Sequence, residues 1–262
     1  MGKKISLLHL LELRYPDQYQ KELYARILCG EVAVDGEIVR EPKRQVARDT
    51  VVAFDSEKYV SRGGIKLEAA LRRWSIDVKG EVVLDVGAST GGFTDCLLKR
   101  GAVLVHAVDS GKNQIAYKLR QDSRVRVFEK TNIMSLTTLD PPPSLAVIDL
   151  SFRSLRRAAS HTLAMTSSGT AIALAKAQFE WQNPPPSFHG VVERDEDLKT
   201  LLVGLLGDLV REEIYIEQIM ESPIRGRKGN REFLLLLRSK NDGASYSAVR
   251  DQLHLLLGHE SG

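Results

Sequence analysis

The sequence predicts an α/β fold with a mostly parallel seven-stranded sheet, preceded by a small α+β module. Two observations carry this prediction. From about residue 65 onward, short apolar runs alternate with helical patterns, which is typical of a parallel sheet covered by helices on both faces. The first 60 residues instead contain two short helical patterns and a hairpin signal at Asp35-Gly36. The predicted strands are residues 82–84, 103–108, 124–128, 145–148, 170–175 and an antiparallel final pair, 213–220 and 232–238.

A glycine-rich turn follows the first predicted strand of the sheet. Gly87, Gly91 and Gly92 surround Ala88, Ser89 and Thr90, and a helical pattern begins at Phe93. Glycine accepts positive φ and permits close backbone approach, while the next helix offers unpaired N–H groups. Such a turn at the carboxyl end of a parallel strand is typical of a cofactor site.

Acidic residues at two strand ends indicate a cofactor that contains a nucleoside. Asp85 ends the first strand, and Asp109, which is 24 residues further on, could bind a ribose diol. Asn132 follows the third strand, where a side chain could touch an adenine edge, although a plain turn role is equally consistent. The turn lacks the G-x-G-x-x-G pattern of dinucleotide sites. D-V-G-A-S-T-G-G-F instead resembles the first motif of class I S-adenosylmethionine-dependent methyltransferases, although similar turns occur in other doubly wound folds.

Composition favours a globular protein with one large or two modest domains. The chain has 262 residues, of which 43% are hydrophobic and 27% charged. No apolar run approaches the roughly 20 residues that span a bilayer, and the leucines near the N-terminus are interrupted by His9 and Glu12, so we expect a cytoplasmic protein. Cys29 and Cys96 have neither metal nor redox spacing and are interpreted as small buried residues. We therefore expect no metal.

The positive charge is concentrated around the glycine turn. The formal net charge is +3, but residues 61–130 carry 13 basic against 8 acidic side chains. A polyanion would be attracted most strongly to this segment. An excess of this size is also compatible with an ordinary solvated surface.

The N-terminal residues form a module of their own. Helical patterns at 5–14 and 18–28 precede predicted strands at 31–34, 37–39 and 50–54. The stretch L-C-G-E-V-A-V-D-G-E-I-V, residues 28–39, resembles the core of the S-four-type RNA-binding domain, although the family's usual opening arginine and Ser-Arg pair are missing. The resemblance implies RNA binding, and solvated surface residues are an equal alternative for each candidate. The candidates are Lys4, Lys21, Arg26, Lys43 and Arg44.

Four charged residues from separate segments are candidates for chemistry. Lys66 lies in the first turn of a predicted helix, where its charge opposes the helix dipole, which hints at a functional reason. Asp149 and Lys176 follow predicted strands, and Glu232 begins one. The predicted topology brings these four side chains to the edge of the sheet that carries the glycine turn. Glu232 is equally consistent with a solvated residue at a strand start.

The motifs together resemble the TlyA family of ribosomal RNA methyltransferases, often labelled haemolysins, whose catalytic domain is similar to FtsJ-type ribose 2′-O-methyltransferases. The matching stretches are Y-V-S-R-G-G-I-K-L-E-A-A-L from Tyr59, D-V-G-A-S-T-G-G-F-T-D-C-L-L from Asp85, K-L-R-Q-D-S-R-V from Lys118, D-L-S-F from Asp149, K-A-Q-F-E from Lys176 and S-P-I-R-G-R-K-G-N-R-E-F-L-L from Ser222. Two departures are Ala177, where the family usually has proline, and residues 181–186, which replace a basic glycine-rich segment.

The resemblance implies a class I Rossmann-like methyltransferase that acts on cytidine ribose in ribosomal RNA. It implies an S-four-type domain at 1–56, a linker at 57–64, an FtsJ-like domain at 65–245 and a C-terminal helix and tail at 246–262. The implied catalytic residues are Lys66, Asp149, Lys176 and Glu232. The expected residues for S-adenosylmethionine are Asp85, Gly87, Ala88, Ser89, Thr90, Gly91, Gly92, Phe93, Asp109 and Asn132. Further RNA contacts are expected from Arg62, Arg225, Arg227 and Lys228.

Two other functions compete with this interpretation. One is a pore-forming haemolysin, as the older family label suggests, and the other is a catalytically silent RNA-binding factor for ribosome assembly. Ribosomal RNA or ribosomal subunits are the expected partners, without a membrane, and the sequence leaves the oligomeric state open. We expect S-adenosylmethionine as the cofactor.

Overall fold

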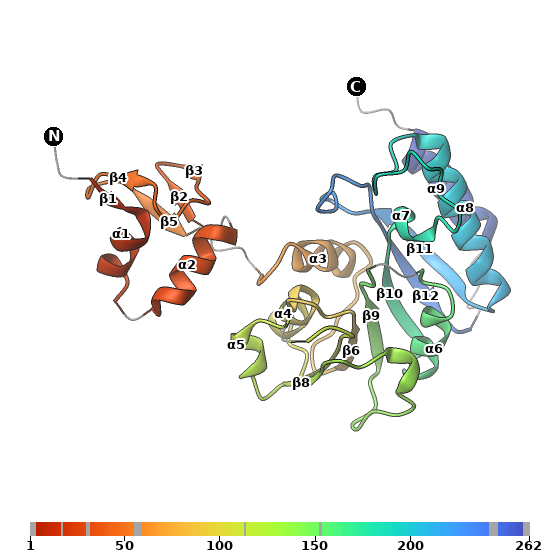
Figure 1. Ribbon diagram of the computed structural model, residues 1–262. Helices are drawn as coiled ribbons and strands as arrows, with labels where there is room; N and C mark the ends of the chain where they lie inside the picture. The colour runs from red at the N-terminus through yellow and green to blue at the C-terminus, as the bar shows by residue number, and fades with distance from the viewer. Residues whose placement is uncertain are drawn as a thin grey trace. The chain divides into compact units, whose positions relative to one another are not determined.

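A computed structural model of the protein describes residues 4–16, 18–29, 32–54, 59–112, 114–151, 154–240 and 246–258. The chain divides into two compact units, Met1–Lys58 and Tyr59–Gly262, which are described separately (Figure 1). Several predicted features lie outside the described part, namely Gly30, which follows the helical pattern at 18–28 as a candidate C-cap, residues 57 and 58 of the linker, Phe152 of the D-L-S-F motif, the side chain of Cys29 and the tail after residue 258.

The N-terminal unit packs two helices against short strands. The helices are α1 (Leu7–Arg14) and α2 (Gln20–Cys29), and β2 (Val32–Val34) pairs with both β3 (Glu37–Ile38) and β5 (Val52–Phe54) in antiparallel fashion. Asp35 and Gly36 both have positive φ, as the predicted hairpin turn requires. The sequence did not indicate the second ladder, in which β1 (Ile5–Ser6) pairs with β4 (Gln45–Val46).

The second unit contains the predicted seven-stranded sheet. Its strand order is β11-β12-β10-β9-β6-β7-β8. The strands from β6 to β10 run parallel, and β12 lies antiparallel between β10 and β11. The strands are β6 (Val82–Val86), β7 (Leu104–Val108), β8 (Val125–Phe128), β9 (Leu145–Ile148), β10 (Thr170–Ala175), β11 (Tyr215–Glu221) and β12 (Phe233–Arg238). The predicted fold class is confirmed.

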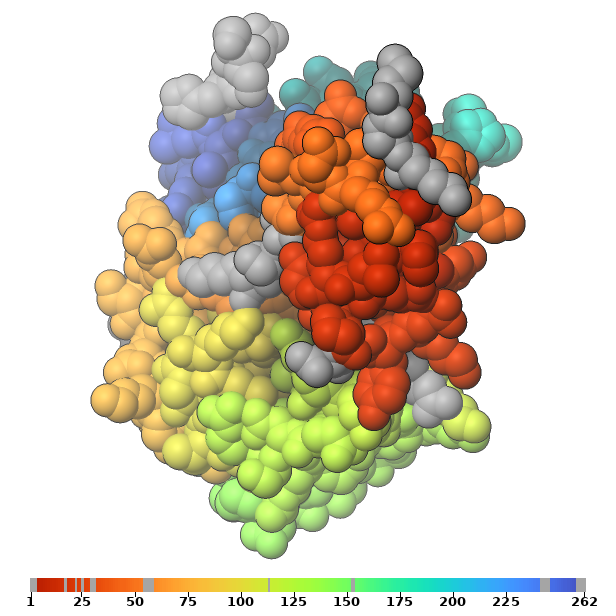
Figure 2. Space-filling model, turned by 90° about the vertical axis from the view of Figure 1, so that its left-hand side faces the viewer, coloured from red at the N-terminus to blue at the C-terminus, as the bar shows by residue number. Residues whose placement is uncertain are grey.

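Helices cover both faces of this sheet. On one face lie α3 (Gly63–Arg73) and α4 (Gly92–Lys99), which adjoin each other in pale orange and yellow in Figure 2. The other face is covered by α6 (Ala158–Ala164), α8 (Asp195–Arg211) and α9 (Tyr246–Gly258). The leucines that recur at helical spacing along α8 are buried against the sheet, namely Leu198, Leu202, Leu205, Leu206 and Leu209. No helix in the described part of the chain is both long and apolar enough to cross a membrane.

The pattern of residues 112–121 predicts a helix that is much shorter in the structure. Among the residues of this stretch that the structure describes, only α5 (Tyr117–Arg120) is helical. The backbone at Ala116 is extended, with ψ of 139°, and its N–H donates to the carbonyl oxygen of Thr90 at 3.1 Å. This hydrogen bond to the glycine turn holds Ala116 in a non-helical conformation, and α5 begins at the next residue.

The first residues of the second unit are fastened to its helices. Tyr59 is 2% exposed and packs against Gly64, and its hydroxyl donates to the Glu68 carboxylate. The backbone N–H of Val60 donates to the Asp95 carboxylate at 2.8 Å. Of the expected linker at 57–64, Tyr59 and Val60 thus contact α3 and α4, and Gly63 and Gly64 already belong to α3.

Replacing a core leucine of α8 should destabilise the second unit. Leu205 is fully buried, whereas Leu255 of α9 is 65% exposed. We expect Leu205→Ala to lower the free energy of unfolding by about 2–5 kcal/mol and the matched control Leu255→Ala to change it little. Urea unfolding followed by tryptophan fluorescence measures this, because both tryptophans, Trp74 and Trp181, belong to the second unit. Equal losses for the two variants would contradict the assigned core.

Candidate active site

The strand register places the candidate charged residues on one face at one edge of the sheet. Val83, Val147, Leu174 and Leu234 belong to the apolar cluster beneath α3 and α4. Side chains two residues apart in a strand share a face, so Asp85, Asp149, Lys176 and Glu232 point the same way. Ala175 pairs with Phe233 in the β10–β12 ladder. Continuing that register by one residue sets Lys176 opposite Glu232.

The four predicted catalytic residues form two adjacent ion pairs. The Lys66 ammonium donates to the Glu232 carboxylate, and the Lys176 ammonium lies 2.5 Å from Asp149 Oδ1, off the direction of a hydrogen bond. Lys176 also donates to Ser151 Oγ at 3.0 Å. Lys66, Lys176 and Glu232 are each less than a tenth exposed. Buried ion pairs of this kind are expensive to desolvate, which favours a chemical role over a stabilising one.

The glycine turn brings the backbone of three segments close together. Gly87 has φ of +85°, and a Cβ added there would lie 2.5 Å from the carbonyl oxygen of Asp149. A Cβ on Gly92 would lie 2.1 Å from Ser61 Oγ. Glycine is therefore required at Gly87, where the clash is with backbone, whereas the Ser61 side chain could rotate away from a Cβ on Gly92. The turn lies directly beside the strand end that carries Asp149.

Asp85 lies beneath the turn and is fully buried. The Thr94 hydroxyl donates to Asp85 Oδ2 at 2.5 Å, and Oδ1 has no hydrogen-bond partner among the described residues. Burial raises the pKa of Asp85 to about 7, with smaller contributions from Asp149 and Asp109, although the Thr94 hydrogen bond lowers it. Asp85 is absent from the cleft wall, so any effect on a cofactor would act through the turn.

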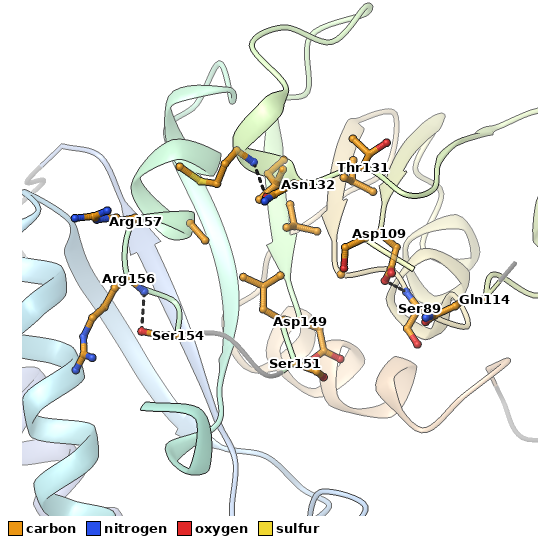
Figure 3. Close-up of a pocket in the computed structure, with 18 residues that line it drawn as sticks. Ser89, Asp109, Gln114, Thr131, Asn132, Asp149, Ser151, Ser154, Arg156 and Arg157 are labelled. Carbon is orange, nitrogen blue, oxygen red and sulfur yellow. Dashed lines mark hydrogen bonds between the residues drawn. The ribbon is translucent and has the colours of Figure 1, made fainter. Parts of the chain in front are cut away.

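A cleft of about 670 Å³ opens at the carboxyl ends of the parallel strands (Figure 3). The predicted residues in its wall are Gly87, Ser89, Asp109, Asn132 and Asp149, whereas Lys66, Ala88, Thr90, Gly91, Gly92, Phe93, Lys176 and Glu232 are outside it. Thr131 and Ser151, which belong to the predicted strand-end segments, also line it, and so do Gln114, Ser154, Arg156 and Arg157, which the sequence did not indicate. Figure 3 shows Asp109, Ser89 and Gln114 on one side and Ser154 and the two arginines on the other.

The Asp109 side of the cleft is held rigidly by backbone groups. Asp109 Oδ2 accepts the N–H of Ser89 at 2.8 Å, and Oδ1 accepts the N–H of Gly111 at 2.6 Å. Asn132 Oδ1 accepts the N–H of Met134 at 3.1 Å and so caps η1 (Ile133–Ser135). Its role as a turn residue is thereby established, and it also faces the cleft.

The candidate RNA-binding residues are mostly exposed. Lys4, Lys21, Lys43 and Arg44 are exposed on the N-terminal unit, and Arg26 is half-buried. On the second unit, Arg62, Arg225, Arg227 and Lys228 are exposed. Arg62 donates to the carbonyl oxygen of Arg225 at 2.6 Å, so the start of α3 and the loop before Glu232 are joined. No group of three or more His, Cys, Asp or Glu residues in the described ranges could hold a metal.

Asp85 should give stability a distinct pH dependence. Its pKa of about 7 in the folded protein exceeds that of an unfolded aspartate, about 3.9, so the folded state binds more protons between these values. Stability should fall as pH rises from about 4 to 7 and then level off. We expect wild type to lose stability relative to Asp85→Asn between pH of about 5 and about 8. Urea unfolding at both pH values measures the difference, and a constant difference would contradict the assignment.

Known proteins resemble this chain along most of its length. The family model described as FtsJ-like methyltransferase matches residues 59–239. YqxC of Bacillus subtilis, a candidate rRNA methyltransferase by name, is 36% identical over 92% of this chain and 88% of its own. The Mycobacterium tuberculosis 16S/23S rRNA (cytidine-2′-O)-methyltransferase TlyA is 39% identical over 86% of this chain and 87% of its own.

A solved structure supports the same relationship. A candidate hemolysin from Streptococcus thermophilus superposes with a TM-score of 0.71 at 33% identity and covers 98% of both chains. The matched family segment includes the glycine turn, the cleft and both ion pairs. The chain therefore belongs to the FtsJ-like methyltransferase family.

Proposed function

We propose that this protein transfers a methyl group from S-adenosylmethionine to a ribose 2′-hydroxyl of ribosomal RNA. The observation that carries the proposal is the pairing of Lys176 with Asp149 and of Lys66 with Glu232 beside the cleft. The name of the relative from Mycobacterium tuberculosis supports cytidine as the nucleotide. Such an activity would take place in the cytoplasm, where the ribosomal subunits are.

The cleft residues fit S-adenosylmethionine, which would supply an electrophilic methyl group. Asp109 would accept hydrogen bonds from the ribose diol, because each carboxylate oxygen can accept a further bond beside the backbone N–H that it already holds. Gly87 and Ser89 would contact the ligand through the tight turn, and Asn132 and Met134 would line the base. A volume of about 670 Å³ lies within the usual range of ligand pockets.

The ion pairs would orient the acceptor hydroxyl. Asp149 and Ser151, which line the cleft, contact the Lys176 ammonium just behind the wall, so Nζ would meet a 2′-oxygen that enters beside them. Lys176 would position that oxygen, and the hydroxyl proton would leave through the Lys176–Asp149 pair as the oxygen bonds to the methyl carbon and the sulfonium C–S bond breaks. The Lys66–Glu232 pair would hold the part of the site next to Lys176, because Glu232 lies opposite Lys176 in the strand register. Accurate placement of the hydroxyl supplies much of the rate in such a reaction.

RNA binding would use both units. The N-terminal unit, residues 1–56, is proposed as an S-four-type module that contacts RNA through Lys21, Lys43 and Arg44. The methyltransferase domain would begin after a short linker and end before the C-terminal helix. Arg62, Arg225, Arg227 and Lys228 would bind phosphates near the target nucleotide, because Arg225 belongs to the loop that leads into Glu232.

Loss of Lys176 should abolish methyl transfer without abolishing RNA binding. The experiment measures transfer of labelled methyl from S-adenosylmethionine to purified small and large ribosomal subunits. We expect an alkali-resistant dinucleotide with wild type, and a loss of roughly 100-fold or more with Lys176→Ala, because the hydroxyl loses its partner. The exposed Lys199→Ala on α8 is the matched control and should retain activity.

Two outcomes would contradict this proposal. If folded wild type labelled neither subunit yet bound RNA, the protein would be a binding factor without methyltransferase activity. If Lys176→Ala kept full activity, the assigned site would be wrong. RNA affinity measured by filter binding separates these cases from misfolding.

The loop before Glu232 should contribute to the salt dependence of RNA binding. Each phosphate contact releases counterions, so losing one lowers the slope of log affinity against log salt by about one. We expect Arg225→Ala, Arg227→Ala and Lys228→Ala together to lower affinity and reduce the slope by up to about three. Lys199→Ala again serves as control. An unchanged slope would place the phosphate contacts elsewhere.

A further inference from the structure

Glu180 is a buried carboxylate close to the cleft that the proposed chemistry does not use. It ends α7 (Ala177–Glu180), the single helical turn that follows Lys176, and is 3% exposed. Glu180 Oε2 accepts the hydroxyl of Ser154 at 2.5 Å, and Oε1 accepts the N–H of Leu155 at 3.0 Å. Burial raises the pKa of Glu180, while both hydrogen bonds and nearby Arg156 lower it. Both oxygens are therefore engaged with the chain after β9.

Residues 176–180 contact the segment that follows β9 at two points. Lys176, at its start, contacts Asp149 and Ser151, and Glu180, at its end, contacts Ser154 and Leu155. The parallel β9–β10 register, in which Ile148 pairs with Ala173, sets Ser151 level with Lys176. One short turn thus fixes both the proposed catalytic residue Asp149 and the wall that follows it.

Residues 154–157, which Glu180 contacts, form the wall of the cleft opposite Asp109 and carry its polar groups (Figure 3). Ser154, Arg156 and Arg157 line the cleft on this side. Arg157 has φ of +59°, an unfavourable backbone conformation for a residue other than glycine. Its N–H donates to both oxygens of Glu212, and Arg156 forms an ion pair with Asp208. Carboxylates of α7, of α8 and of its C-cap Glu212 thus contact residues 154–157, and the strained backbone at Arg157 is of a kind that is common where substrates bind.

Glu180 itself is unsuited to acid or base chemistry on a substrate. It does not line the cleft, and both oxygens accept hydrogen bonds from the protein. Its action must therefore pass through the residues that it holds.

We propose that Glu180 is a positioning residue that sets the acceptor side of the cleft by fixing residues 154–157 relative to Lys176. This inference rests on the proposed methyl transfer. Displacing the wall by about 1 Å would move the RNA hydroxyl away from the methyl donor, and such misplacement costs roughly 100-fold in rate. The Asp109 side is held by separate backbone contacts and would be unaffected.

The test compares Glu180→Ala, which removes both hydrogen bonds, with Glu180→Gln. Glutamine keeps an oxygen for the Leu155 N–H, and its amide can donate to Ser154 Oγ. We expect kcat for ribosomal subunits to fall roughly 100-fold in Glu180→Ala, with KM for S-adenosylmethionine within about twofold of wild type, and to recover to within about fivefold in Glu180→Gln. Ser154→Ala, which removes one of the two bonds, should be intermediate. Glu217→Ala, at the surface pair with Arg238, is the control.

Amide hydrogen exchange provides a readout that does not depend on activity. Glu180→Ala should increase exchange at residues 154–158 and leave the glycine turn at 87–92 protected. Unchanged exchange at Leu155, or unchanged kcat in Glu180→Ala, would overturn the proposal, as would Glu180→Gln being as defective as Glu180→Ala. If wild type transferred no methyl group, the proposed function would fail, and the exchange data would still decide whether Glu180 holds this wall.

Discussion

The antiparallel pairing of β12 with β10 is the constraint on which the site depends. The register joins Thr170 to Arg238 and Ala175 to Phe233, and it continues to Lys176 and Glu232. A slip of one residue would turn Glu232 to the opposite face of the sheet, away from Lys66. Leu235 and Leu237 fill one core cluster and Leu234 and Leu236 fill the other, so leucine occupies both faces and apolar packing alone does not oppose the slip. The polar residues at the two ends of β12 oppose it, because Glu232 pairs with Lys66 at one end and Arg238 pairs with Glu217 at the other.

The charges gathered at this edge work against stability. Lys66 and Glu232 are buried, and Asp85 beneath the turn has an oxygen without a partner in the described residues. Breaking a buried ion pair typically costs about 3–5 kcal/mol, whereas apolar residues of similar size are often better tolerated. Selection for stability alone would not retain such a cluster. The apolar clusters on both faces of the sheet offset the desolvation cost of these charges, so the site can keep them buried.

Residues whose positions follow from local pattern could be predicted from the sequence. The glycine turn, the strands and the shared edge of Asp149, Lys176 and Glu232 all follow from periodicity and from the rule that parallel strands end together. The ion pairs Lys66–Glu232 and Lys176–Asp149 could not be predicted from local pattern, because they depend on the register between strands. Likewise, α5 is shorter than its pattern suggests because the Thr90 carbonyl holds Ala116 extended. Arg156 and Arg157 follow no motif, and only the fold around Glu180 and Glu212 brings them to the cleft.

The two walls of the cleft are held by different kinds of contact, and this difference has a functional consequence. The Asp109 wall is fixed by backbone N–H groups and by Gly87, where any other residue would clash with the main chain of Asp149. The opposite wall is fixed by the side chains of Glu180, Asp208 and Glu212. Side-chain contacts can change by substitution without altering the path of the main chain. Substitutions at Glu180, Asp208 or Glu212 can therefore reshape the second wall while the Asp109 wall keeps its form.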